Sequence, residues 1–261
     1  MPDIFKIIIL AMIQGLTEFL PVSSSGHLGL AQHFLDFDAP GILFEVMVHA
    51  GTLVSVLFYY RKRLARILLE LPQPGSEGQR EALLLLAAVI PVALVGLLGK
   101  SRIEALFNEP RFIAVMLGLM GIVLLSLFFA RSPAHSISLG RAILIGLAQA
   151  IAILPGISRS GMTITTARHL GVEPESAAEF SLLLMVPAVG GAMLLSAGDA
   201  MRSGLGNMTI IQVLLAFVVS ALVGYGAIVI LVRTLRSGHF KWFGFYCVLV
   251  SIVAMLMLKG I

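Results

Sequence analysis

Long apolar segments alternate with short polar ones along this chain. A bilayer crossing needs about 20 mostly apolar residues, and six stretches meet that requirement, at about 41–60, 82–99, 113–130, 179–197, 210–232 and 241–258. Two further stretches, 4–35 and 140–170, begin apolar, break at a cluster of Pro, Gly and Ser, and resume with polar residues. Non-helical backbone is tolerated at membrane depth only inside protein or beside water. Both are therefore predicted to be re-entrant helical hairpins.

The two broken stretches are related to each other. A shift of 135 residues (149 minus 14) aligns Gln14 with Gln149, Ser23 with Ser158, Ser25 with Ser160 and Gly26 with Gly161. Such a weak internal repeat indicates a duplicated membrane fold. Three spans follow each hairpin, and because three is odd the second copy must be inverted. We predict one all-α membrane domain over 1–261, an inverted-topology repeat with halves at about 1–130 and 140–261.

Composition and charge support this assignment. The chain is 58% hydrophobic and 12% charged, far from the usage of soluble domains. Its net charge of +4 comes from basic residues that lie between apolar runs and form no aromatic-interleaved patch, so nucleic-acid binding is not expected. The single Cys247 cannot form an internal disulfide.

The basic residues also predict an orientation. With both hairpins re-entrant, one side collects Arg61, Lys62, Arg63, Arg66, Arg80, Arg131, Arg141, Arg168, Arg233, Arg236 and Lys241. The other side holds only Lys6, Lys100, Arg102, Arg111, Arg202 and Lys259. The richer side is cytoplasmic by the positive-inside rule. Both termini and the mouth of the first hairpin are therefore predicted on the outer side.

The first hairpin carries the stretch "QGLTEFLPVSSSGH". Gln14 and Glu18 are four residues apart and share one helix face, and Pro21 ends that helix. The three serines and Gly26 then offer hydroxyls and unpaired backbone N–H groups at a helix start, which favours phosphate binding. His27 lies one turn further on.

The second hairpin, "LPGISRSG", supplies the matching half. Ser158, Ser160 and Gly161 repeat the first motif, and Arg159 adds a guanidinium suited to phosphate. If both hairpins reach mid-depth, Ser24 and Arg159 face one another. Two plainer interpretations stand beside this one: serine clusters commonly cap helices, and Arg159 can serve as an ion-pair partner of Glu18. A charge at the bilayer centre costs about 2.5–3.5 kcal/mol, which favours a functional site.

A third motif, "FEVMVHAGTL", lies in the first span. It places Glu45 and His49 four residues apart, and Glu179 opens the fourth span at nearly the equivalent repeat position. We interpret these three as residues that orient the site or contact neighbouring helices, rather than as direct participants in chemistry.

These motifs resemble the undecaprenyl-diphosphate phosphatase family of bacterial inner membranes, also called the bacitracin-resistance family. The resemblance covers the whole chain in length, span order and motif spacing. It implies hydrolysis of undecaprenyl diphosphate to the monophosphate, which recycles the carrier lipid for peptidoglycan synthesis, at a site open to the periplasm. It also implies a divalent cation, Mg²⁺ or Ca²⁺, held by Glu18 and substrate phosphates. Where many relatives have two carboxylates, Gln14 leaves this chain with one.

The expected site has two groups of residues. The catalytic residues are expected to be Glu18, Ser24, His27 and Arg159, and the substrate-binding residues Gln14, Ser23, Ser25, Gly26, Ser158, Ser160 and Gly161. Ser24 is the preferred nucleophile, with His27 as general base and Glu18 orienting it. Two assignments stay open beside it: His27 as nucleophile, or a water activated by Glu18 as base or metal ligand.

A second function class remains open at this point. Inverted repeats, broken helices and a mid-membrane anion site are also typical of secondary transporters, so the alternative is a transporter or flippase of the polyprenyl phosphate. The expected partners are the isoprenoid diphosphate, membrane lipids and, as in many such bundles, a second copy of the chain.

Overall fold

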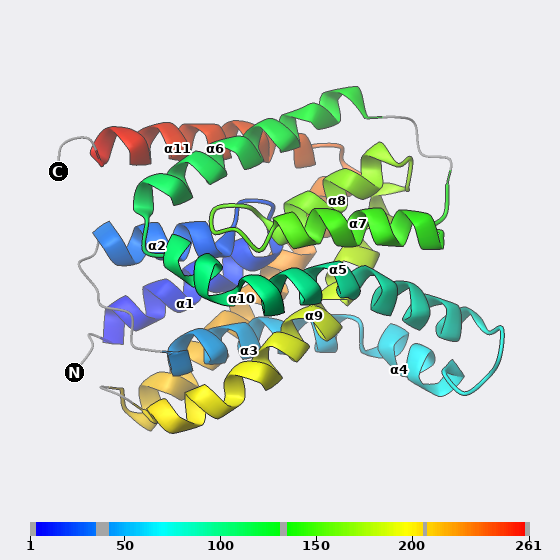
Figure 1. Cartoon of the computed structure of the whole chain (residues 1–261), viewed down its shortest axis with the longest axis horizontal. Helices are drawn as coiled ribbons and strands as arrows, with labels where there is room; N and C mark the ends of the chain where they lie inside the picture. Colours follow the sequence, from blue (N-terminus) through cyan, green and yellow to red (C-terminus); the bar gives the residue numbers. More distant parts are fainter. Residues whose placement is uncertain (1–3, 35–41, 131–134, 206–207, 259–261) are drawn as a thin grey trace.

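The computed structural model describes residues 4–34, 42–130, 135–205 and 208–258 (Figure 1). Arg131 and Lys259, which enter the charge comparison above, lie outside these ranges. The first half of the described chain forms α1 (Ile4–Phe19), α2 (Ser24–Phe34), α3 (Ile42–Tyr59), α4 (Arg61–Glu70), α5 (Glu77–Leu106), α6 (Pro110–Leu125) and the 3-10 helix η1 (Ser126–Phe129). The second half forms α7 (Leu139–Ile151), α8 (Arg159–His169), α9 (Pro174–Ser203), α10 (Ile210–Arg236), the 3-10 helix η2 (Phe240–Trp242) and α11 (Phe243–Met257).

Long apolar helices dominate the fold, as predicted. Among the described residues, five helices are long and apolar enough to cross a membrane, and a sixth span is counted when α3 and α4, bent by 76°, are taken together. Each of the six predicted spans falls on one of these helices. The chain is therefore an all-α polytopic membrane protein.

Two differences from the expected spans have physical causes. Helices α5 and α9 run several residues beyond the apolar stretches at both ends, because backbone hydrogen bonding continues into the polar interface. The segment after the first span, for which no element was predicted, forms α4, whose sequence RKRLARILLE is amphipathic.

Both hairpins break where the sequence predicts. Helix α1 ends before Pro21 and packs against α2, while α7 ends before Pro155 and packs against α8. The two hairpins enter the molecule from opposite ends, and their tips meet near its middle (Figure 1). The described ends of the chain, at the start of α1 and the end of α11, lie at the same end of the molecule.

Helix α10 packs against both α1 and α3, and α11 packs against α6. Interhelical hydrogen bonds support these contacts, since Ser55 Oγ donates to the Ala221 carbonyl at 2.7 Å and Ser251 Oγ donates to the Ala114 carbonyl at 2.6 Å. Large apolar side chains such as Leu98, Leu194 and Leu222 point outward, and this apolar outer surface suits contact with lipid.

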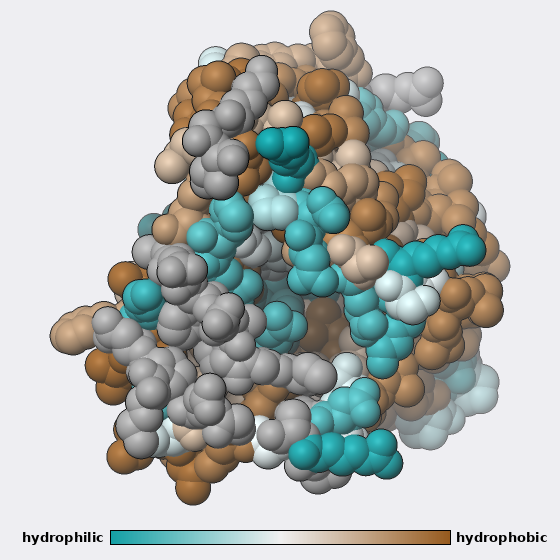
Figure 2. Space-filling view, turned by 60° about the vertical axis from the view of Figure 1, so that its left-hand side comes forward, coloured by the Kyte–Doolittle hydropathy of each residue, from teal (hydrophilic) through white to brown (hydrophobic). Residues whose placement is uncertain are grey.

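The end of the molecule where α1 begins is more polar. Viewed toward this end, polar side chains surround a hollow between apolar flanks (Figure 2).

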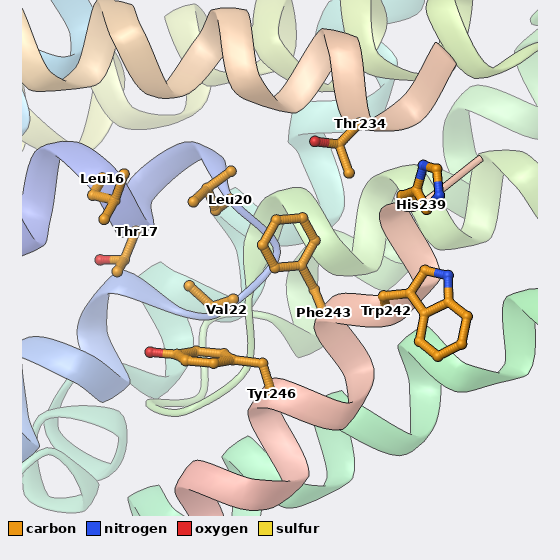
Figure 3. A pocket seen from close by; sticks show the side chains of 9 residues that line it. All are labelled: Leu16, Thr17, Leu20, Val22, Thr234, His239, Trp242, Phe243 and Tyr246. Carbon is orange, nitrogen blue, oxygen red and sulfur yellow. The ribbon is translucent and has the colours of Figure 1, made fainter. Parts of the chain in front are cut away.

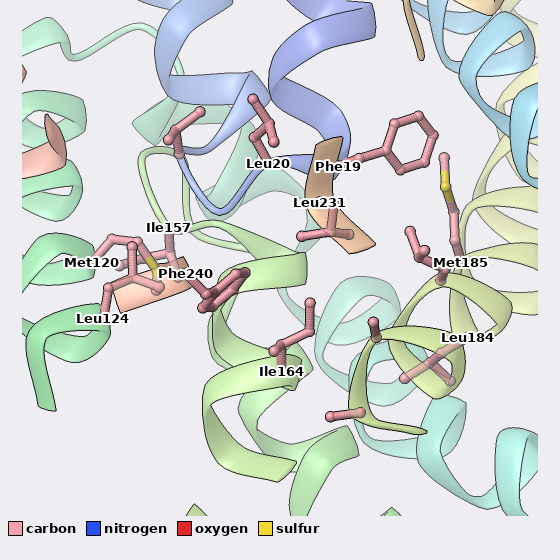
Figure 4. Close-up of a cluster of buried hydrophobic side chains, with 14 of the residues drawn as sticks. Phe19, Leu20, Met120, Leu124, Ile157, Ile164, Leu184, Met185, Leu231 and Phe240 are labelled. Carbon is pink, nitrogen blue, oxygen red and sulfur yellow. The ribbon is translucent and has the colours of Figure 1, made fainter. Parts of the chain in front are cut away.

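The apolar core lies directly beneath the hairpin tips. Phe19 and Leu20 from the first tip and Ile157 and Ile164 from the second hairpin belong to one buried cluster, which Met185 of α9 also joins (Figure 4). Because protein interiors are close-packed, this cluster fixes the two tips relative to each other.

Candidate active site

The tip of the first hairpin positions the acidic side of the site. Gln14 and Glu18 lie on one face of the last turns of α1 and are both buried. Pro21 follows the helix, and Ser23 then adopts a left-handed backbone with φ of 67°. This conformation is strained for a residue other than glycine. It turns the chain sharply, so that α2 begins at Ser24 beside Glu18.

The two tips repeat one capping arrangement. Ser23 Oγ accepts from the Gly26 backbone N–H at 3.2 Å and lies 3.2 Å from Ser25 Oγ. The equivalent atoms of the second tip are Ser158 Oγ, which accepts from the Gly161 N–H at 3.1 Å, and Ser160 Oγ, 3.1 Å away. Ser23 and Ser158 therefore serve as helix caps, the plainer of the two interpretations of the serine clusters.

The two tips approach each other closely. Gly156 has φ of 96°, and a Cβ there would lie 2.4 Å from the Ile113 carbonyl oxygen, so only glycine fits. A Cβ on Gly26 would lie 3.2 Å from the Gly156 Cα. Ser160 Oγ also donates to the Leu20 carbonyl across the tips at 3.3 Å. The site is thus assembled from both halves of the chain.

Glu18 stands at the centre of the site. Its Oε1 accepts from Arg159 Nη2 at 2.7 Å, and its Oε2 accepts from Ser24 Oγ at 2.6 Å and from Gln14 Nε2 at 2.9 Å. The Glu18 side chain is 5% exposed and that of Arg159 is 18% exposed. Ser24 and Arg159 were predicted to face one another, and both donate a hydrogen bond to the Glu18 carboxylate.

Arg159 keeps one donor free. Its Nη1 is buried and has no hydrogen-bond partner among the described residues, while Nη2 contacts Glu18. Guanidinium groups stay protonated and present several N–H donors in a fixed fork. An unpaired guanidinium N–H is a suitable donor for a phosphate oxygen of a ligand.

His27 occupies a different position from the one expected of a base for Ser24. Its Nδ1 lies 2.9 Å from the Ser23 carbonyl oxygen and its Nε2 lies 2.9 Å from the Tyr246 hydroxyl. Because a carbonyl only accepts, Nδ1 carries the proton and Nε2 accepts from the tyrosine. The two rings also stack, with centroids 5.6 Å apart. The acceptor next to the Ser24 hydroxyl is Glu18.

His49 joins the site through Gln14. Its Nδ1 lies 3.0 Å from Gln14 Nε2 and 3.8 Å from Glu18 Oε2. His49 and Glu45 both line a cavity of about 230 Å³ between α3 and α9. Glu179, the third residue of the group predicted to orient the site or to contact neighbouring helices, pairs with Arg63 of α4 at 3.1 Å.

An apolar groove lies next to the site. Leu16, Leu20 and Val22 of the first hairpin face Phe243 and Tyr246 of α11 across a cavity of about 470 Å³ (Figure 3). Tyr246 belongs both to the groove and to the hydrogen bond with His27. A long apolar chain can therefore lie in the groove while its polar head reaches the hairpin tips.

The described residues provide no ready-made cage for a metal ion. Within the described ranges, no three His, Cys, Asp or Glu side chains are grouped so as to hold a metal ion. Glu18 is the carboxylate of the site, and both of its oxygens already accept hydrogen bonds. A divalent cation needs several oxygen ligands, so these residues alone do not fit one. The participation of Mg²⁺ or Ca²⁺ stays a prediction.

Sequence reasoning placed His49 in a supporting role and did not include Tyr246. The spacing of Glu45 and His49 in an apolar span was the available signal for the first of these. Tyr246 lies 219 residues from His27 in sequence, and an aromatic residue in an apolar segment carries no local sign of such a contact.

Comparisons with known proteins agree with these observations. The family described as bacitracin resistance protein BacA matches residues 7–253. A protein of Desulfosudis oleivorans named undecaprenyl-diphosphatase is 41% identical over 92% of this chain and 93% of its own length. Proteins of the same name from Rubrobacter xylanophilus and Moorella thermoacetica are 37% and 38% identical, covering 99% and 98% of this chain and 100% and 99% of their own lengths. The chain therefore belongs to the bacitracin resistance protein BacA family.

Proposed function

We propose that this protein is an undecaprenyl-diphosphatase, which hydrolyses undecaprenyl diphosphate to undecaprenyl phosphate and returns the carrier lipid to peptidoglycan synthesis. The observation that carries this proposal is the contact of one buried carboxylate, Glu18, with both Ser24 at 2.6 Å and Arg159 at 2.7 Å. This contact supports a site in which Ser24 is the hydroxyl nucleophile, Glu18 the proton acceptor and Arg159 the cation that binds phosphate. Phosphoryl transfer depends mainly on such positioning and charge stabilisation.

In the first step, Ser24 Oγ attacks the terminal phosphorus of the diphosphate. The Ser24 proton passes to Glu18 Oε2, to which it already points. The bond from the terminal phosphorus to the bridging oxygen breaks, and undecaprenyl phosphate leaves with that oxygen. Arg159 Nη1, buried and without a partner in the described part of the chain, donates to the transferred phosphoryl group.

In the second step, water attacks the phosphoserine. The bond from phosphorus to Ser24 Oγ breaks, and the serine oxygen recovers the proton held by Glu18. The oxygen of the water leaves in inorganic phosphate. The two steps together consume one water and regenerate the site, as hydrolysis requires.

The apolar groove suits the isoprenoid chain. It begins beside Val22 and Tyr246, next to the hairpin tips, and is lined largely by apolar side chains. A lipid diphosphate that enters sideways from the bilayer would place its first isoprene units here, with its head between Ser24 and Arg159. The predicted substrate-binding role of Ser25, Gly26, Ser160 and Gly161 at the tips belongs to the same proposal.

We also propose that the protein lies in the bacterial inner membrane with both termini in the periplasm. The single domain would then consist of two inverted halves, about 1–130 and 140–261. Three observations support this: the duplicated serine caps, the entry of the hairpins from opposite ends, and the position of the basic helix α4 at the end opposite the start of α1. A C-terminal alkaline phosphatase fusion, which is active only in the periplasm, tests the orientation.

The relatives favour hydrolysis over the transport alternative, because proteins named for this hydrolytic activity match nearly the whole chain. A pure flippase would also need no nucleophile beside its anion-binding arginine.

The decisive experiment uses purified protein in detergent and a prenyl diphosphate labelled in its terminal phosphate. Wild type should release phosphate, whereas Ser24→Ala should lose at least about a hundredfold in turnover. Rapid acid quenching should trap label on wild type as acid-stable phosphoserine. Acid-labile, alkali-stable label would instead assign His27 as nucleophile, and turnover without trapped label in both proteins would favour activated water. A folded wild type that releases no phosphate would refute the hydrolase assignment.

A further inference from the structure

One amide nitrogen lies between two residues of the site. Gln14 Nε2 is 2.9 Å from Glu18 Oε2 and 3.0 Å from His49 Nδ1. An amide nitrogen carries two hydrogens and accepts none. Each hydrogen therefore has its own acceptor, and the two contacts together fix the plane of the Gln14 amide.

The direction of both hydrogen bonds follows from Glu18. This carboxylate faces a guanidinium at 2.7 Å, so it is ionised and only accepts. Gln14 Nε2 must then donate to Glu18 with one hydrogen and to His49 with the other. His49 Nδ1 is consequently an acceptor, and the proton of the neutral ring lies on Nε2.

The reverse orientation of the amide is unfavourable. Rotation by 180° would place Gln14 Oε1 against the Glu18 carboxylate, where two acceptors repel each other. In the present orientation, Oε1 is buried without a hydrogen-bond partner in the described chain. A buried unsatisfied acceptor is costly, so the amide keeps this orientation only because its nitrogen is held on both sides.

His49 is the more accessible end of this chain of contacts. Its side chain is 36% exposed, against 5% for Glu18, and it faces the cavity that it shares with Glu45. Across that cavity, α9 presents Val189, Ala192, Met193 and Ser196, none of which is charged. His49 Nδ1 lies 3.8 Å from Glu18 Oε2, too far for a hydrogen bond, so its hydrogen bond to the site is the one with Gln14 at 3.0 Å.

We propose that His49 is a positioning residue for the phosphatase reaction. It holds the Gln14 amide, and Gln14 in turn holds Glu18 Oε2 against the Ser24 hydroxyl. This inference rests on the proposed function and deepens it. It explains how a neutral amide serves at position 14, because the histidine supplies the acceptor that fixes the amide as a donor to Glu18.

The test compares three variants in the full-length protein. His49→Leu replaces the imidazole ring with an apolar side chain of similar width and so removes the hydrogen-bond acceptor. His49→Asn keeps an acceptor, because Oδ1 of asparagine takes nearly the place of Nδ1. Gln14→Leu removes the amide and is combined with His49→Leu in a double-mutant cycle. His33→Asn, at the far end of α2, is the matched control for loss of a histidine.

Turnover and KM are measured as phosphate release from farnesyl diphosphate, and folding is checked by thermal unfolding. We expect His49→Leu to lower kcat about tenfold, the effect of losing one hydrogen bond of ordinary strength, with KM nearly unchanged. His49→Asn should recover most of this loss, and the control should match wild type. In the Gln14→Leu background, His49→Leu should have no further effect.

Three results would overturn the positioning role: wild-type turnover in His49→Leu, equal losses in folded His49→Leu and His49→Asn, or additive losses in the cycle. The comparison of leucine with asparagine decides the question even if Gln14→Leu does not fold. Failure of the proposed function is a separate result, because it is seen as absent phosphate release by wild type. In that case the positioning role of His49 would also be refuted.

Discussion

Replacement of Arg159 by lysine tests separately the contact of this residue with Glu18 and its proposed contact with the substrate. The guanidinium donates to Glu18 through Nη2 at 2.7 Å and keeps Nη1 free for the substrate. A lysine ammonium is a single point charge and cannot reproduce the fork geometry of arginine. Arg159→Lys should therefore keep the ion pair with Glu18 and lose the directed donor to the phosphate.

The size of the effect follows from this division. Loss of one donor aimed at developing charge lowers kcat by about a hundred- to a thousandfold, or about 2.7–4 kcal/mol in the barrier. Stability should change little, because Glu18 still has a cation beside it. Arg159→Ala differs, since it leaves a carboxylate that is 5% exposed without its partner. Breaking a buried pair in this way costs about 3–5 kcal/mol of folding free energy.

The assay measures phosphate release and thermal unfolding for wild type, Arg159→Lys and Arg159→Ala in the same detergent. The expected pattern is a fully folded but nearly inactive lysine variant and an alanine variant that is both inactive and less stable. Turnover of the lysine variant within threefold of wild type would refute the role of Nη1. Unchanged unfolding of the alanine variant would refute the ion-pair argument.

Three further predictions concern Gly156 at the second hairpin tip, the contact of Tyr246 with His27, and the divalent cation. Gly156→Ala forces a residue with a side chain to φ of 96° and against Ile113, at a cost in folding free energy of at least about 1–3 kcal/mol. A lowered unfolding temperature and lost turnover are expected. An unchanged unfolding temperature would contradict the close approach of the backbone at Gly156 to Ile113. Tyr246→Phe keeps the ring against His27 but removes the hydroxyl, so turnover should fall by less than about tenfold; loss of all activity would assign the hydroxyl a larger part. Because no metal cage is found among the described residues, EDTA should leave the unfolding temperature of the substrate-free protein unchanged, and any effect of EDTA on turnover should be reversed by Mg²⁺ or Ca²⁺. A drop in that temperature would indicate a resident ion.

The predicted homodimer remains a prediction. Light scattering of the purified protein in detergent checks it, by comparing the measured protein mass with the 27.9 kDa of one chain.

The sequence was most informative where residue type dictates backbone form. Pro21 and Pro155 lie in the two breaks of apolar stretches, and each hairpin does break there. The proximity of Glu18, Ser24 and Arg159 also followed, because a repeat places equivalent tips at equivalent depth. These inferences need only local chain geometry and the thickness of a bilayer.

The partners of individual side chains were harder to predict. His27 is one turn from Ser24 in sequence, yet its ring contacts Tyr246 of α11, since helix phase and distant packing decide its direction. Helix α4 was not predicted, because a search for long apolar stretches passes over its charged, amphipathic sequence. Such features depend on contacts between segments far apart in the chain, which a single sequence does not record.

The pairing of Glu18 with Arg159 joins residues 141 positions apart, and this separation constrains how the protein is made. Chains emerge from the ribosome beginning at the N-terminus, so the acidic hairpin is synthesised well before its cationic partner. A lone carboxylate is costly at membrane depth. If the two hairpins insert from opposite sides of the membrane, as proposed, we expect the first hairpin to settle fully only after the second has been made. The ion pair of Glu18 with Arg159 would then be among the last contacts to form during membrane insertion.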